Sequence, residues 1–210
     1  MIFIDHDNTA VNSMYPLHYR IYLDTIKRHP EFPEISYDCW VSMQANGLFE
    51  KVILGPHIKT FNTIWASELH QRPSPEFYPD WIDTMKRLRN RGYYIAVVTH
   101  GLSAECRRAY GQTDFMPDKI YGIPEYTGPR NKPGTFPILD SMNNGNSGPV
   151  YVIGDMPVDM QMAENFNTAT GIIAAYGDGI KVSGTLRHLL SSFKGAIPVT
   201  HVKGILDIIP

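Results

Sequence analysis

The chain has 210 residues, 43% of them hydrophobic, with a formal net charge of -2 at pH 7. This length holds one sizeable core, or a core with a smaller insertion, and the slight negative charge disfavours a nucleic-acid partner because no basic surplus is available for a phosphate backbone. Cys39 and Cys106 form neither a disulfide framework nor a Cys-x-x-Cys pair. A basic, apolar signal segment and a long uncharged apolar run are both lacking. We therefore expect a cytoplasmic protein with no membrane partner.

The first predicted strand runs from Met1 to Ile4 and is followed at once by Asp5-His6-Asp7-Asn8-Thr9. A short apolar run stopped by polar residues is typical of a buried strand, and parallel sheets bind ligands just outside the carboxyl ends of their strands. Two acids at such a place can bind a divalent cation and divide chemical labour. Asp, Asn and Thr also favour turns and helix caps, so these residues alone leave a turn and a catalytic site equally open.

Residues 16–78 form a segment of helical pieces without a convincing buried strand. We predict a helical cap here, inserted into a core made of residues 1–15 and 79–210. Asn12-Ser13 and Arg72-Pro73-Ser74-Pro75 are the expected hinges, and Trp40, Phe61 and Trp65 are expected to form the core of the cap. The predicted breaks between its helices are Pro30, Pro33, Gly47, Gly55 and Pro56.

The remainder of the chain alternates between strand and helix patterns. Helical spacing of apolar residues predicts a helix over 79–91, ended by Gly92. Further helices are predicted over 103–110 and 135–142, with a closing element from about Lys181. The predicted strands are Tyr94 to Val98, Val150 to Ile153 and Thr170 to Ala175. This alternation predicts an α/β fold with a Rossmann-like parallel sheet and helices on both of its faces.

Polar motifs follow three of the predicted strands, and a fourth lies ahead of a predicted helix. They are Asp5-His6-Asp7-Asn8-Thr9, Thr99-His100-Gly101, Lys132-Pro133 and Gly154-Asp155-Met156-Pro157-Val158-Asp159. Together the four motifs resemble the haloacid dehalogenase-like superfamily, and in particular its phosphatases with helical caps. The resemblance covers about residues 1–180, and Phe77–Asp80 and Arg89–Tyr93 resemble its phosphoglycolate-phosphatase-like branch.

The resemblance implies catalytic roles for the first two acids and a Mg²⁺ site. Asp5 would attack phosphorus and form an aspartyl-phosphate, while Asp7 would act as general acid and then general base. Asp5, the backbone carbonyl of Asp7 and Asp155 would bind Mg²⁺, with Asp159 supporting the metal directly or through water. The alternative for Asp159 is an acid that merely favours a helix N-terminus.

Four residues are implied in phosphate binding. Thr99 would donate its hydroxyl, His100 and Gly101 their backbone amides near a helix start, and Lys132 its positive charge. The alternatives are a capping role for Thr99 and a solvated side chain for Lys132.

Three residues of the motifs are unusual for the family, namely His6, Asn8 and His100. Asn8 stands where the family commonly has glycine, and Asn tolerates positive φ, although its side chain is expected to narrow the site. His6 and His100 are unusual at their positions in the motifs, and we expect their rings to be packed and not to bind substrate.

The candidate substrate contacts in the cap lack individual support from the sequence. They are Tyr15, His18, Gln44, Asn46, Phe49 and Lys51.

The sequence therefore predicts a Mg²⁺-dependent phosphatase acting on a small phosphorylated metabolite through an aspartyl-phosphate. A phosphomutase of the same fold and a regulatory protein with a retired active site are the alternatives. The histidines lack His-x-x-x-His spacing, and the chain lacks a Gly-x-x-x-x-Gly-Lys-Ser/Thr loop, which disfavours a zinc hydrolase and a nucleotide-driven kinase.

Overall fold

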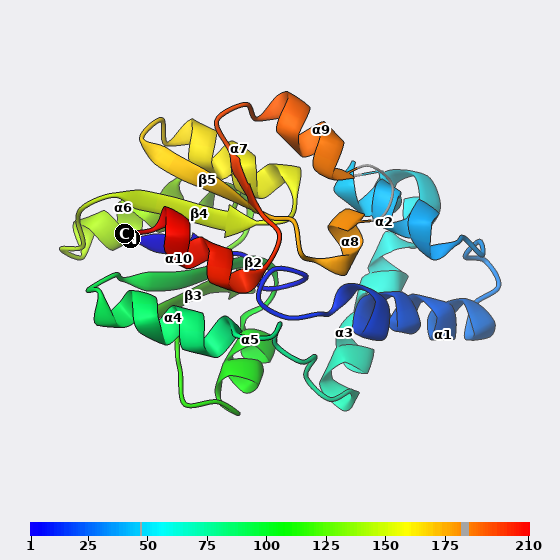
Figure 1. Cartoon of the computed structure of the whole chain (residues 1–210). Helices are drawn as coiled ribbons and strands as arrows, with labels where there is room; N and C mark the ends of the chain where they lie inside the picture. The colour runs from blue at the N-terminus through cyan, green and yellow to red at the C-terminus, as the bar shows by residue number, and fades with distance from the viewer. Residues whose placement is uncertain (47, 182–184) are drawn as a thin grey trace.

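A parallel sheet of six strands, in the order β3-β2-β1-β4-β5-β6, forms the centre of the computed structural model, which describes residues 1–46, 48–181 and 185–210 (Figure 1). The four predicted strands are confirmed. They are β1 (Ile2–Ile4), β2 (Ile95–Leu102), β4 (Val150–Gly154) and β5 (Ala169–Ala174).

The sequence patterns missed β3 (Lys119–Ile123) and β6 (Ile197–Val199), which lie at the two edges of the sheet. Edge strands are short and partly solvated, so they lack the continuous apolar run that marks a central strand. The predicted end of β2 at Val98 was also wrong, because the strand continues through Thr99, His100 and Gly101 to Leu102.

Helices cover both faces of the sheet, as predicted. Successive strand residues point to opposite faces, and Ile2 and Ile4 pack into one apolar cluster while Met1 and Phe3 pack into another. The first cluster includes residues of α4 (Trp81–Asn90), α5 (Ser103–Tyr110) and α10 (Ile205–Ile208), and the second includes residues of α6 (Phe136–Asn143) and α7 (Pro157–Asn165). A further cluster joins β5 and α7 to α8 (Asp178–Lys181) and α9 (Thr185–Ser192).

The described residues between 14 and 71 are mostly helical, and Figure 1 shows α1, α2 and α3 gathered together beyond one end of the sheet. Trp40 and Phe61 are buried in an apolar cluster of this segment and Trp65 packs against it, which confirms the expected aromatic core. Gly47, one of the predicted breaks, lies outside the described residues. The elements are η1 (Met14–Tyr19), α1 (Arg20–Arg28), α2 (Tyr37–Ala45), η2 (Phe49–Leu54), η3 (Gly55–His57) and α3 (Ile58–Gln71).

The two connections between this helical segment and the sheet run side by side. The amide of Asn12 donates to the carbonyl of Glu76 at 2.9 Å, and the amide of Tyr78 donates to the carbonyl of Ala10 at 3.0 Å. The chain thus leaves and rejoins the sheet layer at one place, where these hydrogen bonds join its two segments next to the predicted hinges.

Two short turns complete the elements of the described residues. They are η4 (Gly128–Arg130) and η5 (Val202–Gly204).

Candidate active site

The predicted site residues gather where β1, β2 and β4 end. Strand β1 pairs with both β2 and β4, so the chain crosses to opposite sides of β1, and the carboxyl edge at such a switch point is where open α/β sheets bind ligands. Asp5 follows β1, Thr99 lies near the end of β2, and Asp155 follows β4. Parallel alignment alone brings these three residues to the same edge.

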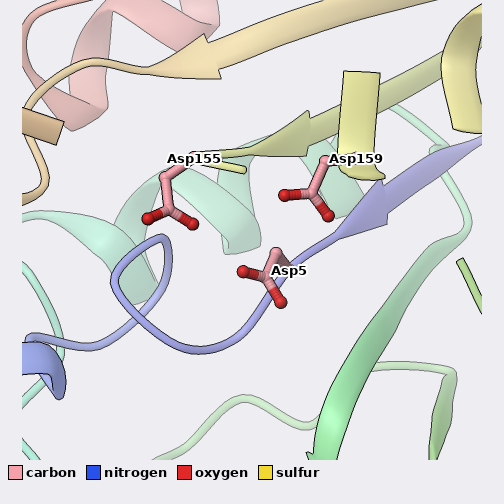
Figure 2. A group of neighbouring side chains, drawn as sticks. All are labelled: Asp5, Asp155 and Asp159. Carbon is pink, nitrogen blue, oxygen red and sulfur yellow. The ribbon is translucent and has the colours of Figure 1, made fainter. Parts of the chain in front are cut away.

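Three buried carboxylates converge at this edge. One oxygen of each of Asp5, Asp155 and Asp159 lies within 4.8 Å of the others, and Figure 2 shows the three side chains directed toward a shared space. Burial and the charges of Asp5 and Asp159 raise the pKa of Asp155 well above its ordinary value. Burial also raises the pKa of Asp159 to about 6, against the opposing charge of Lys132. Clustered hard oxygen donors that repel one another fit a divalent cation such as Mg²⁺.

Lys132 is buried among these acids, so its interpretation as a solvated loop lysine is wrong. Its Nζ lies 2.6 Å from Asp5 Oδ1 and 2.6 Å from Asp159 Oδ1. Burial acts to lower the pKa of Lys132, but the charges of Asp159 and Asp5 outweigh it and raise the pKa. The ammonium therefore stays positive and balances part of the acidic charge.

Asn131 holds the lysine loop in place, although nothing in the sequence pattern singled it out. Its Nδ2 donates to the carbonyl of Thr99 at 2.7 Å, and its Oδ1 accepts from the amide of Lys132 at 2.7 Å. One asparagine in a loop rich in proline and glycine carries no local signal, because its bond to Thr99 joins the loop to a strand 32 positions away in the sequence.

Asp159 occupies the first turn of α7 and also belongs to the acidic group. Its Oδ2 accepts from the amide of Met156 at 3.0 Å, as expected of an acid at a helix N-terminus, while its Oδ1 contacts Lys132. A metal-supporting role for Asp159 stays a prediction. A Cβ placed on Gly154 would lie 2.2 Å from Asp159 Cγ. Only glycine at position 154 permits this approach.

Asp7 lies outside the group of three carboxylates and faces a helix of the helical segment. Its Oδ1 lies 2.8 Å from Nε2 of His18, and the His18 ring stacks on Trp65 with centroids 5.4 Å apart. Burial acts to raise the pKa of Asp7, but the charge and hydrogen bond of His18 lower it well below its usual range. The backbone carbonyl of Asp7 remains a predicted metal ligand.

Of the six residues predicted to contact substrate, His18 lies against Asp7, a predicted catalytic residue. Phe49 is buried in the aromatic cluster, and Asn46 donates from Nδ2 to the carbonyl of Ser42, so both have structural contacts. Tyr15, Gln44 and Lys51 stay predictions as substrate contacts.

The Thr99-His100-Gly101 motif lies beside Asp7. Thr99 is buried, and its Oγ1 accepts from the amide of Gly101 at 2.9 Å, so that amide already has a partner. A hydroxyl that accepts one bond keeps its own proton for donation. A Cβ on Gly101 would lie 3.2 Å from both Asp7 Oδ2 and Thr99 Oγ1, which shows how closely these groups approach. The helix begins at Ser103, after the motif rather than within it.

The two histidines of the motifs differ: His6 is packed, as expected, whereas His100 is exposed. The buried His6 ring packs near Phe77 and Tyr110, with centroids 6.4 and 5.7 Å away, and burial lowers its pKa. His100 donates from Nε2 to the carbonyl of Lys132 at 2.7 Å.

Comparisons with known proteins agree with the family resemblance of the sequence motifs and with the observed fold. A family model described as haloacid dehalogenase-like hydrolase matches residues 2–173, whereas a comparison with curated proteins finds no match. A haloacid dehalogenase-like family hydrolase from Streptococcus pneumoniae is 17% identical and has a TM-score of 0.77, with 100% of this chain and 97% of that chain covered. A predicted phosphoglycolate phosphatase from Haemophilus somnus is 16% identical, with a TM-score of 0.74 and the same coverage. At these identities the likeness establishes the fold.

Within the described parts of the chain, none of the helices combines the length and apolar character needed to cross a bilayer.

Proposed function

Because the chain belongs to the haloacid dehalogenase-like hydrolase family, we propose that it is a Mg²⁺-dependent phosphatase that hydrolyses a small phosphorylated metabolite. The observation that carries the proposal is Asp5, a buried carboxylate at the end of β1 that contacts the Lys132 ammonium and lies beside Asp155 and Asp159. A nucleophile in such surroundings suits phosphoryl transfer, which needs positive charge around a phosphoryl group that repels anions.

In the proposed reaction, an oxygen of Asp5 attacks phosphorus and the bond from phosphorus to the leaving alcohol breaks. Asp7 gives a proton to that alcohol and later takes one from the water that attacks the aspartyl-phosphate. The contact with His18 lowers the pKa of Asp7, so this role requires the leaving alcohol to replace His18 at Asp7 and Asp7 to take up the proton that it then donates. Hydrolysis releases inorganic phosphate and restores the Asp5 carboxylate. The separation of Asp7 from the acidic group supports this division, since its side chain contacts His18 rather than the other carboxylates.

The remaining motif residues bind the phosphoryl group in this proposal. Lys132 neutralises charge on both phosphate and nucleophile, and Thr99 donates its hydroxyl proton to a phosphate oxygen. The backbone amide of His100 is a further proposed donor to the phosphate, and that of Gly101 would exchange its bond to Thr99 Oγ1 for one to the phosphate. Mg²⁺ held by Asp5, the carbonyl of Asp7, Asp155 and Asp159 would supply further positive charge to the phosphoryl group.

We further propose that residues 16–78 act as a cap over a core of residues 1–15 and 79–210, and that this cap selects the leaving group. The separate aromatic cluster of the helical segment and its hydrogen-bonded crossing to the sheet layer support a movable unit. The contact between His18 and Asp7 supports closure directly over the acid–base residue.

Phosphate release across a panel of phosphorylated metabolites, with Mg²⁺ or with a chelator, tests the function. We expect release that requires Mg²⁺ and is lost in Asp5→Asn, which preserves side-chain shape but removes the nucleophile. Asp83→Asn, a charge-matched change on the exposed surface of α4, should leave release unchanged. An isomerised sugar phosphate as product would instead support the mutase, and no turnover of any compound would support the regulatory protein.

A further inference from the structure

Asn8 occupies the position where the family commonly has glycine, and its side-chain amide makes two hydrogen bonds inside the site. Its φ is 59° and it is fully buried, a conformation that Asn adopts more readily than other non-glycine residues. Its Nδ2 donates to Asp155 Oδ2 at 2.6 Å, and its Oδ1 accepts from the Tyr78 hydroxyl at 3.0 Å. The amide therefore contacts a carboxylate of the proposed metal site.

The polarity of this amide is determined by its two neighbours. The cation-binding form of Asp155 is an ionised carboxylate, which can only accept hydrogen bonds, so in that form the NH₂ end of Asn8 must face Asp155. The oxygen end then faces Tyr78, whose hydroxyl donates to it. Tyr78, which lies just before α4, thus stabilises the orientation in which Asn8 meets Asp155.

Close packing leaves the Asn8 side chain little room to rotate. A Cβ placed on Gly177 would lie 2.5 Å from the Asn8 carbonyl oxygen and 2.8 Å from Asn8 Nδ2. The neighbouring Tyr176 hydroxyl donates to the carbonyl of Thr9 at 2.9 Å, and its ring lies edge-on to that of Tyr78 with centroids 5.1 Å apart. Two tyrosines from distant parts of the chain thus hold the loop that carries Asn8.

The Asp155 carboxylate receives a hydrogen bond on each oxygen. Thr9 Oγ1 donates to Oδ1 at 3.3 Å, while the bond from Asn8 to Oδ2 is shorter, at 2.6 Å. A glycine at position 8 would leave Asp155 with only the longer of these two bonds, so its orientation would be less restrained.

We propose that Asn8 is a positioning residue whose amide, oriented by Tyr78, holds Asp155 in the orientation that binds the divalent cation. The inference rests on the metal site of the proposed function. Hydrogen bonds to metal-ligating carboxylates orient them before the metal arrives, and their loss typically weakens metal affinity by about 10–100-fold.

Isothermal titration of the purified full chain with Mg²⁺, without substrate, tests this role. We expect Asn8→Gly to raise the Mg²⁺ dissociation constant by about 10–100-fold, because glycine accepts the positive φ and only the amide is lost. The matched control is Asn167→Gly, an exposed asparagine with φ 61° that precedes the start of β5. It should bind Mg²⁺ like the parent.

A second variant separates positioning from a general loosening of the fold. Tyr78→Phe removes one hydroxyl and should weaken Mg²⁺ binding less than Asn8→Gly does. In the Asn8→Gly background it should have no further effect, because Tyr78 acts through the amide. Parent-like affinity in Asn8→Gly, or equal weakening by Tyr78→Phe in both backgrounds, would refute the role.

Phosphate release by the same proteins distinguishes this inference from the proposed function. If the parent hydrolyses a phosphate ester with Mg²⁺ but Asn8→Gly keeps full Mg²⁺ affinity, the positioning role fails and the phosphatase stands. If Asn8→Gly weakens binding but the parent hydrolyses no phosphate ester, the phosphatase fails and the positioning role stands. A parent that binds no Mg²⁺ would overturn the role together with the metal site.

Discussion

Gly154→Ala probes the approach of α7 to the end of β4. The added Cβ would lie 2.2 Å from Asp159 Cγ and 2.3 Å from its Oδ2, whereas ordinary van der Waals contact begins at 3.4 Å. The Asp159 carboxylate must therefore retreat by about 1.2 Å, the difference between 3.4 and 2.2 Å. That movement disturbs its contact with Lys132 and its place among the three carboxylates.

Overpacking by the added methyl group determines the expected loss of stability, and displacement of the Asp159 carboxylate determines the expected loss of rate. Inserting a methyl group into a well-packed site costs about 1–3 kcal/mol, and a domain of this size loses about 2–4 °C in Tm per kcal/mol. We expect a decrease in Tm of about 2–12 °C. A catalytic group displaced by about 1 Å typically costs about 10²-fold in rate, so phosphate release should decrease by that factor.

Differential scanning calorimetry and a phosphate-release assay measure the two effects. Gly195→Ala is the matched control, because a Cβ at Gly195 meets nothing within 4 Å, and it should change the free energy of unfolding by less than about 0.5 kcal/mol. If Gly154→Ala kept both the Tm and the turnover of the parent, the argument that glycine is required beside Asp159 would be wrong.

The remaining predictions concern pH and the buried lysine. Without metal, Asp159 has a folded pKa of about 6, above its value near 4 in an unfolded chain, so the parent should lose stability relative to Asp159→Asn as pH rises from about 4 to about 6. Urea unfolding at several pH values in a chelator measures this difference, and a difference that grew in favour of the parent would contradict the sign. Lys132→Met leaves Asp5 and Asp159 buried without their cation, so we expect a loss of about 3–5 kcal/mol in the free energy of unfolding and no phosphate release. A parent-like denaturation midpoint in that variant would show that the lysine does not balance the acids.

Local sequence patterns predicted the structure correctly where it depends on residues that are neighbours along the chain. Central strands such as β1 and β4 are buried on both faces, so their apolar runs and the polar residues that end them are visible in the sequence. The positions of Asp5 and Asp155 after these strands follow from the same pattern, whereas the tolerance of Asn8 for positive φ follows from its residue type. The edge strands β3 and β6 lack such runs and were missed.

The sequence by itself determined the type of fold and which acids follow the central strands, because both are recorded in short-range patterns of burial. Only the tertiary structure decided what those acids contact. Asn8 and Asp155 are 147 positions apart, and Lys132 and Asp159 are 27 apart. The pairing of His18 with Asp7 likewise depends on how the helical segment packs against the sheet edge. Such contacts depend on the order of strands in the sheet, which no window of neighbouring residues contains.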